Sequence, residues 1–213
     1  MTVTHPHLQI HRAEVSTQVG TEIRRLDSAR VDRILLGDDQ AFRGLVVEYH
    51  ALAFGLAYRC LGDAQDAEEV VQDAFVKIHS ALDGFRGEAS LKTWIMRIVW
   101  RLALNRRRDR ARSAWRRLGL HQSDDDADAT LPGPRSESPE ARLLSRETNR
   151  LVRRVVEDLP PMLREVLILN SFEELGYEEI ARILDIPVGT VSSRIHTARR
   201  KLAGQLRKLN PTK

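Results

Sequence analysis

Residues 192–200 carry polar side chains of the types and spacing that DNA recognition uses. They belong to a segment whose apolar residues recur at three- and four-residue steps, as the inward face of one helix requires. Those apolar residues are Val188, Val191, Ile195, Ala198 and Leu202. The opposite face presents hydroxyl, imidazole and guanidinium groups, which can bond base edges or phosphates. The candidates are Ser192, Ser193, His196 and Thr197 for base edges, with Arg194, Arg199 and Arg200 for phosphate or guanine.

A short helix beginning near Tyr177 should brace this segment. Its apolar face consists of Ile180, Ile183 and Leu184, and the tight connection DIPVGT follows it. Two helices joined in this way form a helix-turn-helix, whose second helix enters a DNA groove. A solvated basic face is the alternative. It does not explain why acids are absent from 188–208 while the preceding helix is rich in glutamate.

Charge is segregated elsewhere in the chain as well. The stretch 92–117 holds ten Lys or Arg against the single acid Asp109, whereas 63–73 holds five acids and no base. The net charge of +4 over 213 residues conceals this separation. Separate basic and acidic segments predict a polyanionic partner and a different, protein partner.

The elements that position these residues are all expected to be helical. Apolar residues recur at helical spacing over 42–56, 70–82 and 91–102, and no useful strand alternation is present. Gly62 and Asp63 should separate the first two helices, with Asp63 or Asp66 as an N-cap, and Ser90 can cap the third. We therefore predict an all-α chain with a helical domain over 27–112.

The remaining segments complete the predicted organisation. Residues 1–26 are expected to form a disordered extension. Residues 113–138 are rich in acids and prolines and poor in apolar residues, so we expect a flexible linker. A second domain over 139–210 should begin with Ser138 as N-cap before Pro139 and contain helices at roughly 140–158, 161–172, 177–184 and 188–208. Two small helical domains joined by a flexible linker result.

Several classes of function are disfavoured. The single cysteine, Cys60, excludes an intramolecular disulfide, and the chain has neither a signal peptide nor a membrane span by pattern, so we expect a cytoplasmic protein. His5, His7 and His11 lack further ligands that would complete a metal site. No catalytic motif, catalytic residue or cofactor site is evident, and we expect no enzyme activity.

Two long segments resemble one known family. GYEEIARILDIPVGTVSSRIHTARRKL resembles the fourth conserved region of bacterial RNA polymerase σ factors of the extracytoplasmic-function (ECF) group, within the σ-70 family. DAEEVVQDAFVKIHSALDGFRGEASLKTWIMRIVWRLALNRRR resembles their second region. The order of the two and the linker between them also agree. A helix-turn-helix alone would be a weak signal, whereas both segments in this order are specific.

The resemblance implies roles for residues in both segments. Such σ factors bind core RNA polymerase, including its β′ and β subunits, direct it to promoters and help melt the −10 element. The acidic helix corresponds to the surface that docks on the β′ coiled coil, with Asp66, Glu68, Glu69, Gln72, Asp73 and Lys77. The −10 element is implied to meet Phe85, Arg86, Glu88, Ser90, Lys92, Arg97, Trp100, Arg101 and Asn105. The helix-turn-helix would recognise the −35 element.

Three of the −10 positions need comment. Trp94 lies on the apolar stripe, so we expect it in the core, while Trp100 falls off that stripe and is predicted to be the exposed aromatic. Many relatives have Asn near the position of Arg101, so the preferred −10 sequence is left open. Asn105 matches a polar position that is common in the family.

The resemblance also implies regulation by an anti-σ factor that covers both modules. A conventional helix-turn-helix regulator that binds an operator as a dimer is the main rival interpretation. The arginine-rich, aromatic helix after Phe85 argues against it, because a small-molecule sensor domain has no need of such a helix. An enzyme that acts on nucleic acid is a weaker rival.

Overall fold

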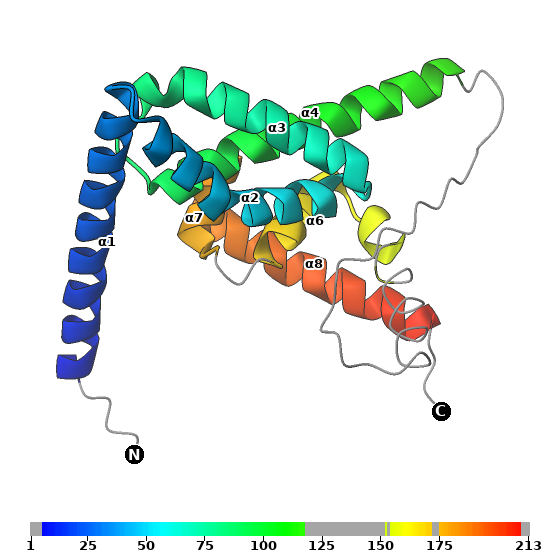
Figure 1. Ribbon diagram of the computed structural model, residues 1–213. Helices are drawn as coiled ribbons and strands as arrows, with labels where there is room; N and C mark the ends of the chain where they lie inside the picture. Colours follow the sequence, from blue (N-terminus) through cyan, green and yellow to red (C-terminus); the bar gives the residue numbers. More distant parts are fainter. Residues whose placement is uncertain (1–5, 118–151, 153, 172–174, 210–213) are drawn as a thin grey trace, which may run out of the picture.

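The computed structural model describes residues 6–117, 152, 154–171 and 175–209, and all its regular elements in these ranges are helices (Figure 1). They are α1 (Pro6–Leu35), α2 (Asp39–Leu61), α3 (Ala64–Ala81), the 3-10 turn η1 (Leu82–Gly84), α4 (Leu91–Arg117), α6 (Pro161–Asn170), α7 (Tyr177–Leu184) and α8 (Val188–Leu209). The predicted all-α class is confirmed. None of these helices is long and apolar enough to cross a membrane.

Local side chains set the ends of the N-terminal helices. Asp38 caps α2 by accepting from the Ala41 N–H at 2.9 Å. Gly62 ends α2 with φ 74, a left-handed conformation that glycine adopts without steric cost. Asp63 then caps α3, accepting from the Asp66 N–H at 2.8 Å. The predicted break at residues 62 and 63 is confirmed, and Asp63 is the cap.

Helices α2, α3 and α4 pack on one another to form the core of the N-terminal module. Each contributes side chains with no exposed surface, including Leu56, Ile78 and Ile95. Full burial of such a side chain stabilises the fold by roughly 1.5–3 kcal/mol. Because three helices share this core, α4 is held firmly along the face that meets α2 and α3.

The expected disordered extension over 1–26 is wrong where the structure describes it, because α1 begins at Pro6. Proline suits the first position of a helix, and the 30-residue helix contains no other proline. The second half of α1 is tied to α2 by an ion pair of 2.5 Å between Arg30 and Glu48. The N-terminal part of α1 extends away from the other helices, while its C-terminal end packs on α2 and η1 (Figure 1).

The predicted linker begins too early, since α4 continues to Arg117 rather than ending at 112. Its arginines are good helix formers, so the basic run extends the helix. The rest of the linker and the expected N-cap at Ser138 lie outside the described residues. Residues 154–157 are helical, α6 is two residues shorter than expected, and α7 has the predicted bounds.

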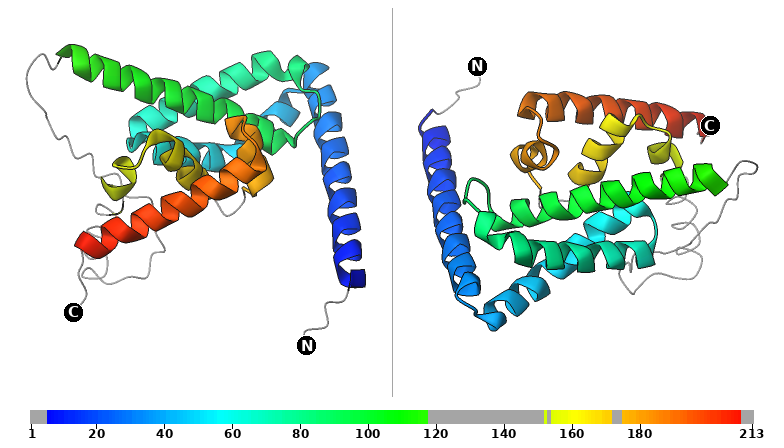
Figure 2. Two further views of the ribbon diagram at one scale, coloured as in Figure 1. Left: turned by 180° about the vertical axis from the view of Figure 1, so that it is seen from behind. Right: turned by 90° about the horizontal axis from the view of Figure 1, so that it is seen from above.

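Helices α6, α7 and α8 form the C-terminal module, which packs against the N-terminal one. Its buried residues include Val166, Ile180 and Ile195. Helix α7 contacts α4, and α6 contacts α2. Helix α4 consequently lies between α2 and α3 on one side and the C-terminal helices on the other (Figure 2).

Candidate nucleic-acid interface

Helix α8 presents the polar face that the sequence predicts. Its inward stripe is buried at Val191, Ile195 and Ala198. On the outward side, Arg194 and Thr197 are half-buried, and the other predicted residues are exposed. The exposed ones are Ser192, Ser193, His196, Arg199 and Arg200. No other described element covers these exposed side chains, so this face is accessible to a DNA groove.

Three of these side chains already have partners within the module. Arg199 donates to Asn170 Oδ1 of α6 at 2.7 Å, which directs its guanidinium along one side of α8. Arg194 lies 3.5 Å from the sulfur of Met162, also in α6. Ser193 donates to the carbonyl of Thr190 one turn earlier, at 3.1 Å. Of the serines, Ser192 has no such local bond in the described structure and stands free for a base edge.

The turn between α7 and α8 is unusual at one residue. Asp185 ends α7 with φ 58 and ψ 50, and it is the only described non-glycine residue with positive φ. A side chain in this left-handed region is disfavoured by roughly 1–2 kcal/mol. The turn is closed by a bond of 3.1 Å from the Ile186 N–H to the Ala181 carbonyl.

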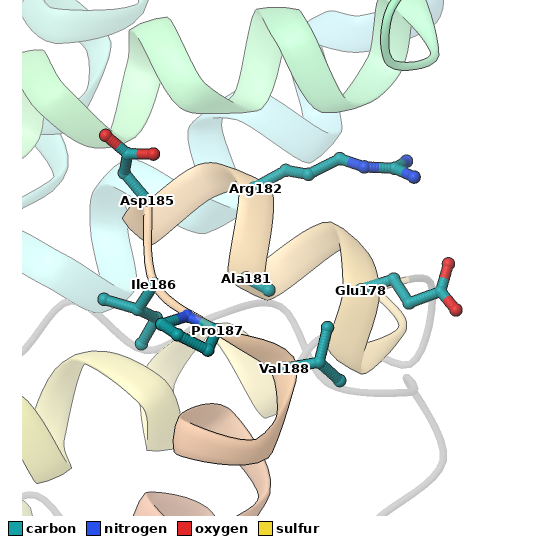
Figure 3. Close-up of a pocket in the computed structure, with 7 residues that line it drawn as sticks. All are labelled: Glu178, Ala181, Arg182, Asp185, Ile186, Pro187 and Val188. Atoms are coloured by element: carbon teal, nitrogen blue, oxygen red, sulfur yellow. The ribbon is translucent and has the colours of Figure 1, made fainter.

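An open pocket of about 560 Å³ lies beside this turn (Figure 3). Ala181, Ile186 and Pro187 line its apolar part, while Asp185 points toward α4. The carboxylate of Asp185 is 3.9 Å from Arg97 of α4, a distance at the outer limit of an ion pair. The Asp185 side chain is largely exposed and that of Arg97 is half-buried, so at this distance the pair contributes little to stability.

A stronger contact joins the starts of α7 and α4. Glu179 accepts from the Gly176 N–H at 2.9 Å through one carboxylate oxygen and so caps α7. Its other oxygen accepts from the Thr93 hydroxyl at 3.0 Å. Thr93 is 1% exposed and Glu179 is half-buried, so this bond is partly shielded from water. One carboxylate therefore serves as helix cap and as a bridge between the modules.

The first turn of α4 has two further acceptors. Ser90 accepts from the Thr93 N–H at 3.2 Å, which confirms the predicted cap. Asp27 of α1 accepts from the Leu91 N–H at 2.7 Å. Burial raises the pKa of the Asp27 carboxyl, and this bond from Leu91 partly offsets the effect. The sequence does not predict the contacts of Asp27 and Glu179 with α4, because each joins residues that lie far apart in the chain.

Most of the residues that the sequence implies for the −10 element surround the start of α4. Arg86, Glu88, Arg101 and Asn105 are exposed, and Phe85, Ser90, Lys92 and Arg97 are half-buried. Phe85 and Trp94 meet edge to face with ring centroids 5.7 Å apart. These two rings, together with the basic side chains around them, form an aromatic and positively charged surface.

The prediction for Trp100 is wrong, whereas Trp94 packs against the core as predicted. Trp100, expected to be exposed, is 1% exposed, while Trp94 is half-buried and one side of it packs against the core. Trp100 follows Thr93 by seven residues and Arg97 by three, so it lies on the face of α4 that meets α7. A single stripe cannot describe α4, because this helix is covered on two sides. The Trp100 indole nitrogen has no hydrogen-bond partner within the described residues.

The acidic helix α3 exposes only part of its predicted polar set. Gln72, Asp73 and Lys77 are exposed beside Val76, whose exposure of 73% the sequence pattern does not predict. The other members have partners within the chain: His50 lies 3.2 Å from Glu68, Arg106 lies 2.8 Å from Glu69, and Arg110 lies 2.5 Å from Asp66. The arginine-rich end of α4 thus neutralises the start of α3.

The described residues contain no cluster of His, Cys, Asp or Glu suited to a metal ion. His5, His7 and His11 lie outside the residues whose side chains the structure describes. Cys60 is buried, and burial raises the pKa of its thiol. The candidate residues for binding lie on α3, on α4 with the loop before it, and on α8.

Comparison with known families matches both modules. A family described as Sigma-70 region 2 matches residues 45–113, and one described as Sigma-70, region 4 matches residues 149–202. The first range contains the acidic helix and the start of α4, and the second contains the helix-turn-helix. Each of the three surfaces falls within a matched range.

Known proteins and structures agree with these matches. The chain is 38% identical to the RNA polymerase sigma-H factor of Pseudomonas aeruginosa over 187 residues, covering 86% of this chain and 95% of that protein. It is 36% identical to the ECF RNA polymerase sigma-E factor of Escherichia coli K12 over 192 residues, again covering 86% and 95%. A structure of CnrH in complex with the cytosolic domain of CnrY aligns with a TM-score of 0.59 and 28% identity, over 85% of this chain and 97% of that one.

Proposed function

The chain belongs to the ECF group of σ-70 family factors, and we propose that it recognises promoters through two DNA-binding surfaces on α8 and α4. A σ factor acts by binding core RNA polymerase and directing initiation of transcription at promoters. The single observation that carries the proposal is the exposed polar face of α8 on a helix-turn-helix, in one chain with the aromatic and basic surface of α4.

The outward face of α8 fits the major groove of the −35 element. Ser192, Ser193 and His196 are exposed near the start of the helix, where residues reach base edges. Arg199 and Arg200 lie one turn further on, at a position suited to phosphates. We therefore assign base discrimination to the first group and sequence-independent affinity to the second.

The surface at the start of α4 fits the −10 element. Single-stranded DNA is held by stacking of bases on aromatic rings and by positive charge along the backbone. Phe85, in the loop before α4, and Trp94, in α4, supply the rings. Lys92 and Arg101 of α4 supply positive charge. Trp100 is not assigned to this surface, because its side chain is buried.

Core polymerase is proposed to dock on the exposed part of α3. Gln72, Asp73 and Lys77 surround the exposed apolar side chain of Val76. An apolar centre with a polar rim is the usual anatomy of a protein interface. Asp66 and Glu69 contribute indirectly, since their carboxylates are engaged by arginines of α4.

Promoter recognition requires the two modules to separate. In the structure α7 covers one face of α4, and Arg97 of the −10 set faces Asp185 of the other module. Two DNA elements far apart on a promoter cannot both be reached by modules that pack on each other. Binding to polymerase would hold them apart and raise the effective concentration of each surface at its own element.

We further propose that an anti-σ factor restrains this protein. The structural relative CnrH was solved in complex with a cytosolic domain of CnrY, and the alignment covers most of both chains. A partner bound to both modules would keep the −10 surface from DNA. A protein that acts with core polymerase on chromosomal promoters would do so in the cytoplasm, and we propose this location for it.

In vitro transcription tests the proposal. Purified protein is mixed with core polymerase and a library of genomic fragments, and new start sites are mapped by sequencing. We expect start sites that share one −35 and one −10 sequence, and tight binding to DNA only with polymerase present. Absence of binding to core polymerase, or a dimer that binds an operator tightly alone, would contradict the proposed function.

A further inference from the structure

The helix that carries the −10 surface begins at a backbone amide that is bonded to a side chain of another helix. The Leu91 N–H donates to Asp27 Oδ2 at 2.7 Å across a separation of 64 residues. The first N–H groups of an α-helix have no partner inside the helix, and a neighbouring side chain usually supplies one. Ser90 does so for Thr93. Helix α4 therefore has a local cap and a distant one.

Helix α1, which supplies the distant cap, also borders the loop before α4. Gly87 in this loop has φ +69, and a Cβ added to it would lie 3.6 Å from the Ser28 hydroxyl. Helix α1 packs on η1, at the other end of the loop. Asp27 is half-buried, and its neighbour one turn on, Arg30, is paired with Glu48 of α2. Contacts from α1 thus reach both ends of the loop and its middle.

We propose that Asp27 is a positioning residue for −10 recognition, which rests on the proposed function of α4. Its carboxylate sets the direction of the first turn of α4 and thereby places the loop 85–90 and the side chains that follow. Asp27 precedes the family match at 45–113, so a segment outside that match controls the geometry of the surface inside it.

The role of Asp27 is expected to grow when the modules separate. In the structure, the other module also holds the first turn of α4 in place, through the bond between Thr93 and Glu179. Separation removes that bond, whereas Asp27 belongs to the same module as α4 and stays in contact. A carboxylate repels phosphate, so Asp27 acts on DNA binding through geometry and not as a ligand of the backbone.

Three variants test the proposal. Asp27→Ala removes the acceptor, and Asp27→Asn removes the charge while keeping an acceptor oxygen. Asp32→Ala is the matched control, since it removes the same charge from an exposed position on the same helix. Each full-length protein is assayed for affinity for core polymerase, for the rate of promoter opening, and for hydrogen exchange at the Leu91 amide.

We expect Asp27→Ala to speed exchange at Leu91 and to slow promoter opening by about fivefold, in line with loss of a helix cap. Its affinity for core polymerase should stay within about twofold of wild type, because the docking helix is untouched. Asp27→Asn should recover most of the opening rate, and Asp32→Ala should behave as wild type.

Two results would overturn the proposal. One is faster exchange at Leu91 in Asp27→Ala with an unchanged rate of opening, which would leave Asp27 as a structural cap only. The other is an equal defect in Asp27→Ala and Asp27→Asn. Failure of the wild-type protein to bind polymerase would contradict the proposed function instead, and exchange at Leu91 distinguishes that case because it needs no polymerase.

Discussion

At the scale of single residues, the structure separates side chains that face DNA from those that serve the fold. His196 is exposed near the start of α8, and Arg199 is oriented by its bond to Asn170. Asp185 has a different role, since it closes the turn between the two helices in a left-handed conformation. Replacing each of these residues is therefore expected to have a different effect.

Replacing His196 and Arg199 should have different effects on DNA recognition. His196→Ala should reduce discrimination at particular −35 bases by roughly 1–3 kcal/mol, because a base-edge contact is lost. Arg199→Ala should weaken binding to all promoters about equally and lower the salt dependence. Competition binding of the polymerase complex to promoter variants measures both. Uniform effects from both replacements would contradict the division of roles.

Asp185→Gly should stabilise the protein. Glycine adopts φ 58 without the steric cost that Asp185 bears, and the distant contact with Arg97 contributes little. We expect a gain in the free energy of unfolding of roughly 0.5–1 kcal/mol, measured by urea denaturation. Asp158→Gly is the control at a residue without positive φ. A loss of stability in Asp185→Gly would show that its side chain is needed in the turn.

At the scale of elements, α3 divides into an end bound by arginines and an exposed end. Asp66 is 19% exposed at its side chain and meets both Arg106 and Arg110. Asp73, two turns further along the helix, is exposed. The first acid therefore supports the packing of α3 on α4, and the second is available to polymerase.

Replacing Asp66 and Asp73 should separate these roles. Asp66→Ala should lower the free energy of unfolding by about 1–2 kcal/mol, because it leaves two arginines without their shared partner. Asp73→Lys should leave stability unchanged within about 0.5 kcal/mol and weaken binding to core polymerase by about tenfold or more. Denaturation and polymerase titration measure the two effects. Equal polymerase binding by Asp73→Lys and wild type would reject α3 as the docking surface.

At the scale of the whole molecule, the packing of the two modules is the feature with most bearing on function. The bond from Thr93 to Glu179 joins them near one end of α4. Cys60 of α2 lies near Arg164 and Glu165 of α6, where α2 and α6 meet. Burial raises the pKa of this thiol, so its protonated form persists and reacts slowly while the modules are packed together.

The reactivity of Cys60 should therefore report separation of the modules. Thr93→Val keeps the side-chain shape but removes the hydroxyl that bonds Glu179. Loss of a hydrogen bond to a charged group weakens the packed state by roughly 1.5–3 kcal/mol, so alkylation of Cys60 should accelerate by about tenfold or more. Mass spectrometry of the modified protein gives the rate, and Ser80→Ala is the control at an exposed site. An unchanged rate would mean that this bond does not hold the modules together.

The sequence by itself determined the helices, the helix-turn-helix and the polar face of α8, because each depends on spacing within one short segment. It also indicated the family, through two segments whose matched ranges agree with it. The wrong prediction for α1 also concerns local sequence, since a proline such as Pro6 is typical of the first position of a helix.

Only the tertiary structure decided which polar and aromatic side chains of those segments remain accessible. Trp100 is buried, Asp66 is engaged by arginines and Asp27 caps a helix that begins 64 residues later. Periodicity reports one buried face of a helix, whereas α4 has two covered sides. Contacts between residues far apart in the chain arise from packing of whole helices, and spacing within a segment carries no information about them.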